Sequence, residues 1–231
     1  MPPGDGGRIP GIGKKREGEI TKVKGFILST TLVREEDKIV KILTPTEIFT
    51  LYRFYGARHS PIQRGNLIDF VIEKNPKGGI DRLRSPVQIP LLSPTLPLFL
   101  PLQWENFFQF LAFHFRGIST ISPFYYRKLV AMGEELGVRP SLRVLVEGLF
   151  EIFQFEGILP PIGKCGRCGL PTGERVALEK NTLHWCHPDC LPSTPHFFSP
   201  ALGELYLYRK TLLFSQGELE KLWFFLIGKG E

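Results

Sequence analysis

The spacing of apolar residues changes partway along the chain, and this change restricts the fold more than any other feature of the sequence. Before a proline-rich stretch, polar and apolar residues alternate: Asp69 and Glu73 are interleaved with Ile68, Phe70 and Ile72, as in half-buried β-strands. After it, apolar residues recur every three or four positions, the spacing of amphipathic helices. We therefore predict an α+β protein in which strands precede helices.

Five short segments before the prolines are rich in Ile, Val, Phe, Tyr and Thr, and turn residues bound each of them. These predicted strands span residues 19–29, 38–43, 48–55, 66–74 and 79–84. Short strands in such number are typical of a small closed barrel, and a five-stranded OB-type barrel is the commonest solution. An SH3-like barrel satisfies the same pattern.

The helical part is predicted to form a separate domain. Helices are expected from Trp104 to Phe115, from Ser122 to about Leu136, and from the capping residues Ser141 and Ser215 onward. Their aromatic stripes are interpreted as core. The predicted divisions are a disordered leader (1–18), an OB-fold DNA-binding domain (19–88), a proline-rich connector (89–103) and a helical domain (104–231) with a zinc finger at 163–192.

Positive charge is concentrated in the amino-terminal part. The formal net charge is +6; residues 1–90 hold 16 Lys and Arg against 10 Asp and Glu, whereas the remaining residues hold 13 of each. A basic unit beside a neutral one favours a polyanionic partner such as nucleic acid. Charge that serves solubility alone is the other interpretation.

All four cysteines lie between residues 165 and 190. They form two pairs: two residues lie between the cysteines of the first pair and three between those of the second, with 17 residues between the pairs. Thiolates at this spacing can surround one metal ion, and the glycines at 163, 166 and 169 suit a tight turn with positive φ. Two disulfides are the alternative, which the expected cytoplasmic location disfavours, because the first residues have no secretory signal and no segment suits a membrane span.

A structural zinc ion is therefore the expected cofactor, held in a zinc finger with four cysteine ligands. His184 and His187 lie near the second pair and are interpreted as bystanders. The predicted metal ligands are Cys165, Cys168, Cys186 and Cys190.

Two stretches of the barrel segment resemble the opening of bacterial RecO recombination mediators. The first runs from Lys24 to Thr44; the second, from Tyr55 to Gly65, resembles the Gly-Ala-Arg loop of that family with its following basic residues. The cysteine segment follows residues 155–160, where many members carry theirs, so the resemblance covers roughly residues 19–190. Two departures are His59, where the family often has a basic residue, and the longer glycine-rich leader.

The resemblance implies an OB-fold domain, a helical domain with a zinc finger, and no catalytic residue. Such proteins bind single- and double-stranded DNA (ssDNA and dsDNA) and anneal complementary strands. They work with RecR to load RecA onto DNA coated by single-stranded DNA-binding protein. A cytoplasmic, nucleoid-associated protein is the corresponding expectation.

Basic side chains of the barrel are the predicted DNA contacts, because Lys and Arg along a groove neutralise phosphates and release counterions. Tyr52, Phe54 and Tyr55 offer stacking faces, although their alternation does not show which of them face the core. The predicted DNA-binding set is Lys22, Lys24, Arg53, Arg58, Arg64, Arg82 and Arg84. A protein-interaction scaffold and a zinc-containing nucleic-acid enzyme stay open as other functions.

Overall fold

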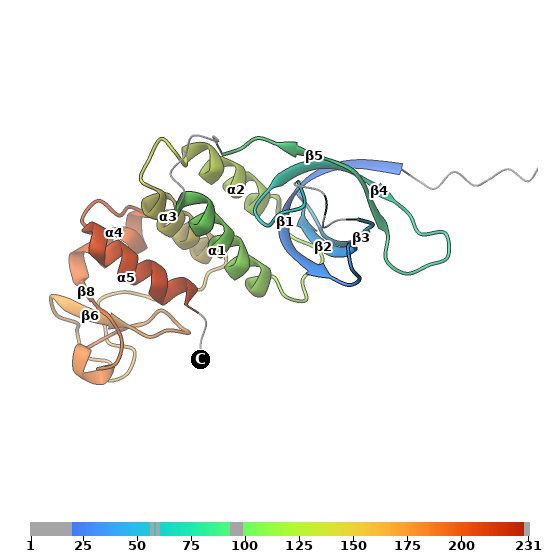
Figure 1. Ribbon diagram of the computed structural model, residues 1–231. Helices are drawn as coiled ribbons and strands as arrows, with labels where there is room; N and C mark the ends of the chain where they lie inside the picture. The colour runs from blue at the N-terminus through green and yellow to red at the C-terminus, as the bar shows by residue number, and fades with distance from the viewer. Residues whose placement is uncertain (1–19, 56–57, 59–60, 93–98, 229–231) are drawn as a thin grey trace, which may run out of the picture.

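A computed structural model describes residues 20–55, 58, 61–92 and 99–228 (Figure 1). The predicted leader at 1–18, most of the Gly-Ala-Arg loop including His59, and residues 93–98 of the predicted connector lie outside the described residues. Within the described part, a barrel comes first and helices follow, as the change in apolar spacing predicts.

Five strands form the closed barrel: β1 (Ile20–Leu32), β2 (Lys38–Leu43), β3 (Ile48–Arg53), β4 (Leu67–Glu73) and β5 (Arg82–Ile89). Their order around the barrel is β1-β2-β3-β5-β4. The strand β1 bends so that its first half pairs with β4 and its second half with β2. Gly25 permits this bend, because a Cβ there would come within 2.7 Å of the Leu43 carbonyl oxygen on β2. The OB-type prediction is confirmed.

Two boundaries differ from the sequence prediction. The strand β5 was expected at 79–84 but ends at Ile89, and Pro86 is accommodated there beside a shift in register against β4. The helix α1 (Phe99–His114) begins inside the predicted connector, with Pro101 in its first turn. Proline is tolerated in that turn because the first helical amides have no partner within the helix.

The helices that follow α1 are α2 (Pro123–Glu135), α3 (Ser141–Phe155), α4 (Ser199–Tyr208) and α5 (Gln216–Ile227). They pack around α3, which contacts the other four helices and is buried along most of its length. Ser122 caps α2 and Ser215 caps α5, as predicted, whereas Ser141 does not cap α3: its hydroxyl donates to Gln103 Oε1 at 2.6 Å. The aromatic stripe of α1, with Phe107 and Phe108 fully buried, is core as expected.

A small sheet connects α3 to α4 and carries the cysteine segment. Its strands are β6 (Arg175–Leu178), β7 (Trp185–Cys186) and β8 (His196–Phe198), in the order β7-β6-β8, and the short 3-10 helix η2 (Pro188–Cys190) follows β7. No helix among the described residues is long and apolar enough to cross a membrane.

Barrel and helices are joined by more than the connector. The barrel has its own interior, but Phe26 and Leu67 belong to the same apolar cluster as the helices. The Trp104 indole on α1 donates to the Gly65 carbonyl at 3.0 Å, and the backbone of Ile48 donates to Ser119 at 2.7 Å. One end of the barrel is therefore covered by helices, whereas at the opposite, open end the described residues 33–35, 54–55 and 76–80 are exposed.

Candidate metal centre and nucleic-acid interface

A tight turn places the first two cysteines. Gly163 and Gly169 adopt positive φ on either side of the pair, as the sequence predicts, and the amide of Gly169 donates to the Cys165 carbonyl at 2.9 Å. The third glycine, Gly166, has another role: a Cβ there would lie 2.7 Å from the Cβ of His184. Cys165 is buried and Cys168 is exposed, so the turn places one sulfur in the interior and the other at the surface.

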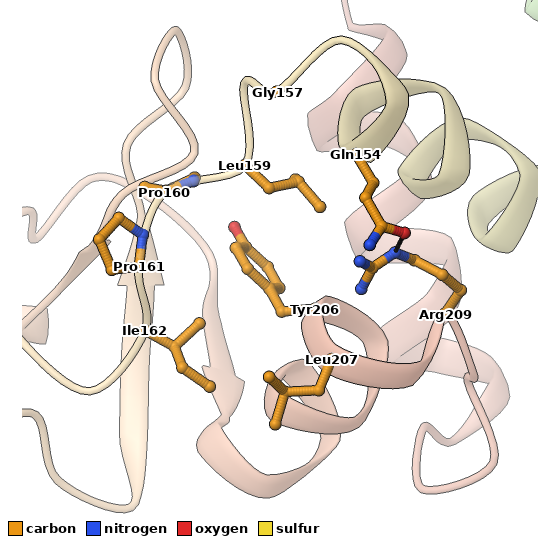
Figure 2. Close-up of a pocket in the computed structure, with 9 residues that line it drawn as sticks. All are labelled: Gln154, Gly157, Leu159, Pro160, Pro161, Ile162, Tyr206, Leu207 and Arg209. Atoms are coloured by element: carbon orange, nitrogen blue, oxygen red, sulfur yellow. Dashed lines mark hydrogen bonds between the residues drawn. The ribbon is translucent and has the colours of Figure 1, made fainter.

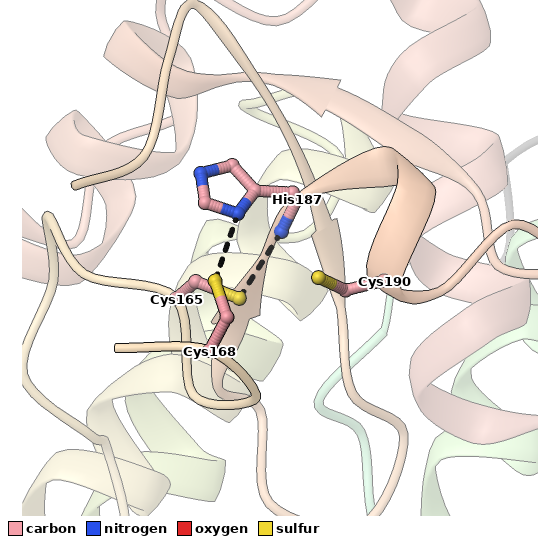
Figure 3. A group of neighbouring side chains, drawn as sticks. All are labelled: Cys165, Cys168, His187 and Cys190. Atoms are coloured by element: carbon pink, nitrogen blue, oxygen red, sulfur yellow. Dashed lines mark hydrogen bonds between the residues drawn. The ribbon is translucent and has the colours of Figure 1, made fainter. Parts of the chain in front are cut away.

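His187, directly before η2, and Cys190, the last residue of η2, complete a group of four potential metal ligands. The ligand atoms of Cys165, Cys168, His187 and Cys190 all lie within 4.8 Å of one another, and Figure 3 shows the side chains converging. For zinc–sulfur bonds of about 2.3 Å, tetrahedral geometry places two sulfurs about 3.8 Å apart. The group can therefore hold a metal ion with little movement of its side chains.

The ring of His187 is oriented for metal binding. Its Nε2 lies 2.9 Å from the Pro171 carbonyl oxygen, which can only accept a hydrogen bond. In the neutral ring, Nε2 therefore carries the proton, and the lone pair is on Nδ1, which lies 3.3 Å from the Cys168 sulfur. A backbone carbonyl that sets the tautomer in this way is typical of histidines that bind metals.

This group contains His187, whereas the sequence predicts Cys186 as the fourth ligand, and the Cys186 thiol itself interacts with that of Cys165, so the choice between the two stays a prediction. The Cys186 side chain is fully buried in β7, where pairing with Ala177 on β6 sets its position. His187 lies one residue beyond that strand. The sequence did contain a signal for it, because His187 and Cys190 repeat the two-residue spacing of Cys165 and Cys168.

The thiols of this segment differ in acidity. Burial opposes ionisation of Cys165, but the backbone amides of Cys168, His187 and Arg167 point at its sulfur and lower its pKa to about 6. Burial raises the pKa of Cys190 to about 11, and the neighbouring Cys165 adds to this effect. Burial also raises the pKa of Cys186. Cys165 is therefore the sulfur that most readily becomes a thiolate, the form that binds metals.

A pocket of about 260 Å³ lies between the end of α3, residues 157–162 and the end of α4 (Figure 2). Its walls are mainly apolar, and Arg209 Nε donates to Gln154 Oε1 at 2.6 Å. The hydroxyl of Tyr206 donates to the Leu183 carbonyl at 2.6 Å. The polar groups of this pocket are thus engaged in holding the fold.

Four predicted DNA-binding residues gather on the outer surface of β1, β4 and β5. Lys22 pairs in register with Val71, and Val71 with Arg84, so Lys22 and Arg84 lie in one row across three strands. Lys24 and Arg82 belong to the rows on either side. Acidic residues of β4 lie among them: Lys22 Nζ is 3.4 Å from Asp69, and Glu73 accepts from both Arg82 and Arg84.

The three other predicted residues lie elsewhere. Arg53 is partly buried on β3; burial and the nearby Arg84 lower its pKa, and it donates to the Leu83 carbonyl at 3.2 Å. Arg58 lies at the open end of the barrel, paired with Glu36. Arg64 faces α1, where it donates to Gln109 at 3.3 Å, and its side chain is only 25% exposed.

The structure thus combines a closed OB-type barrel that carries cationic side chains on its outer surface with a helical part, and a group of thiols and an imidazole lies in the segment between α3 and α4. Residues 23–92, which make up most of the barrel, match the family model described as RecO N terminal. This match confirms the resemblance over the barrel segment, which is similar to the amino-terminal domain of RecO proteins. No curated protein matches the chain.

Proposed function

We propose that this protein is a recombination mediator that binds DNA through the outer surface of β1, β4 and β5. The observation that carries the proposal is the row formed by Lys22 and Arg84, with Lys24 and Arg82 beside it. Long cationic side chains on adjacent strands, about 4.8 Å apart, can follow a phosphate backbone. The RecO family consists of recombination mediators rather than catalytic enzymes, which agrees with this role.

Strand annealing needs no catalytic group in this scheme. A surface that binds two strands through their phosphates reduces the repulsion between them and leaves the base edges free to pair. We propose that the protein binds ssDNA and dsDNA, anneals complementary strands, and acts with RecR to load RecA onto DNA coated by single-stranded DNA-binding protein.

The metal is proposed to be zinc with a structural role. Three sulfurs and one imidazole nitrogen form a donor set that zinc takes in structural sites, and four protein ligands leave no position for a water molecule. The ion would hold the turn at Cys165 against the segment around η2. Metal analysis of the purified chain tests its identity.

The DNA proposal is tested with the full-length chain, because one end of the barrel is covered by helices. Binding of labelled ssDNA and dsDNA is followed by fluorescence anisotropy across a range of salt concentrations. The double variant K22A/K24A should bind more weakly, and its dependence of log K on log salt should be less steep by about 0.7 for each lost phosphate contact on ssDNA.

The matched control is K210A/K221A, which removes two exposed lysines of the helical part. It should bind DNA as the wild type does. Absence of binding by the wild type in dilute buffer would contradict the proposal and favour a protein-interaction scaffold. Cleavage of the DNA would favour an enzyme. Annealing of coated strands, with and without RecR, then tests the mediator role.

A further inference from the structure

One carboxylate on the outer surface of the barrel is shared between two arginines. Glu73, the last residue of β4, accepts from Arg84 and lies 3.5 Å from a guanidinium nitrogen of Arg82, both on β5. Glu73 pairs in register with Arg82, and Arg84 lies two residues further along the same strand. Among the described residues, these two arginines form ion pairs with Glu73 alone, so two positive charges share one negative charge.

A third guanidinium adds to this excess of positive charge. Burial and the nearby charge of Arg84 lower the pKa of Arg53 on β3. The Nη1 atom of Arg53 donates to the Leu83 carbonyl, but its Nε atom is buried and has no hydrogen-bond partner within the described part of the chain. Cations gathered on low-dielectric walls produce a field that attracts anions.

The Glu73 side chain is an anion within reach of solvent. The hydrogen bond from Arg84 holds the pKa of Glu73 below its usual 4.5, so the group is ionised at neutral pH. The side chains of Glu73, Arg82 and Arg84 are 29%, 33% and 42% exposed. Ion pairs in contact with water contribute little to stability. Another anion can therefore replace this carboxylate without disturbing the barrel interior.

A phosphate is the anion that fits the donors held by Glu73. The planar guanidinium group binds carboxylates and phosphates through the same N–H donors. The other acidic residue of this surface, Asp69, lies 3.4 Å from Lys22, whose flexible side chain is 75% exposed and can reach a phosphate without losing a fixed geometry. Glu73 is thus the acidic residue that occupies donors a phosphate would need.

We propose that Glu73 is an internal competitor of DNA: its carboxylate occupies the donors of Arg82 and Arg84, and a DNA phosphate must displace it before these arginines can bind the strand. This inference rests on the proposed DNA-binding function and names a residue that limits its affinity. The carboxylate belongs to the same chain, so it is present at a high effective concentration whatever the concentration of DNA. It returns to the arginines when the DNA leaves.

The test compares the variant E73Q with the wild type, using the full-length chain and labelled ssDNA in fluorescence anisotropy. Glutamine has the size of glutamate but no charge, so one more guanidinium charge becomes available to the phosphates. E73Q should bind about 5-fold more tightly at about 0.1 M salt, and its dependence of log K on log salt should be steeper by about 0.7, the value for one added phosphate contact on ssDNA. The gain in affinity should disappear as the salt concentration approaches about 1 M.

Two further variants separate competition from a simple effect of charge. E220Q removes the same charge from an exposed position on α5, which lies at the opposite end of the molecule from the barrel (Figure 1), and should bind DNA as the wild type does. E73D keeps the charge, but its side chain is one methylene shorter and cannot hold both arginines. It should bind more tightly than the wild type and less tightly than E73Q.

Each outcome decides for or against the competitor. Equal affinities of E73Q and E220Q overturn it. Weaker binding by E73Q also overturns it, because Glu73 would then orient the arginines for DNA. Wild-type affinity in E73D overturns displacement and assigns any gain in E73Q to charge alone. Absence of ssDNA binding by the wild type at every salt concentration overturns the DNA-binding function itself. Circular dichroism checks the fold, and if E73Q does not fold, E73D decides the proposal.

Discussion

The outer surface of the barrel and the interior of the carboxyl-terminal helical part contain charged pairs that differ in burial. On the barrel, Lys22, Arg82 and Arg84 lie on the outer surface and pair with acidic residues in contact with water. In the helical part, the side chain of Glu147 is 5% exposed and accepts from Arg139 and from the backbone and hydroxyl of Thr211. Cys165 is also buried.

This difference in burial matters for the proposed DNA binding. Exposed pairs exchange partners at little cost, so the barrel surface can release its acidic neighbours and accept phosphates. Buried groups cannot be left without a partner, so those of the helical part connect elements of the fold. Under the proposed function, charged side chains would therefore bind a ligand on the barrel, whereas those around Glu147 stabilise the fold.

The largest effect should come from removing the metal. H187A should lose the bound ion, because it removes one of four ligands, whereas C186S should retain it. Zinc binding contributes roughly 10–16 kcal/mol in zinc-finger peptides, so H187A should unfold the small sheet at a much lower temperature than the wild type. Metal content and thermal unfolding measure both effects. Loss of the metal in C186S but not in H187A would restore the four-cysteine site.

A smaller but still large effect is expected for the buried carboxylate. E147A leaves Arg139 and Thr211 without their partner and should lower the free energy of unfolding by about 3–5 kcal/mol. The exposed pair of Lys22 and Asp69 provides the comparison, and K22A should cause no measurable loss of stability. Urea unfolding of both variants tests the contrast. Equal losses would show that burial does not distinguish the two regions.

A variant of Arg64 tests whether this side chain binds DNA or stabilises the contact between barrel and helices. It was predicted to bind DNA, but its contacts with Gln109 and Glu105 place it between barrel and helices. We expect R64A to lower the free energy of unfolding by about 1–2 kcal/mol and to leave the salt dependence of DNA binding unchanged. A shallower salt dependence in R64A than in the wild type would return this residue to the DNA surface.

The smallest effect concerns pH. The hydrogen bond from Tyr52 and that from the amide of Tyr55 lower the pKa of Asp37 below its usual 3.8. A lowered pKa means that the carboxylate stabilises the fold above about pH 4 and that this stabilisation is lost as pH falls through the lowered value. The stability difference between wild type and D37N should therefore be constant near neutral pH and shrink in acid. A difference that grows in acid would contradict this assignment.

Local patterns in the sequence were sufficient for the barrel strands, for α1, α2, α3 and α5, and for the region of the metal site, but not for α4 or the small sheet. Alternation at 66–74 predicts β4, and the serines at 122 and 215 predict the starts of α2 and α5. The clustering of cysteines identifies the metal-binding segment, because metal ligands must converge on one point and short spacings achieve this within a turn. These features depend on neighbours in sequence.

Features that depend on distant residues were decided by the tertiary structure. Pairing of β7 with β6 buries Cys186 and leaves His187 beside the sulfurs. Packing of α1 on the barrel encloses Arg64, and the turn ending in Asp37 holds Tyr55 outward. The sequence by itself determined which residue types were available and where most of the barrel strands and helices form. Only the packing of elements far apart along the chain decided which side chains meet, because burial and partners are properties of the folded chain.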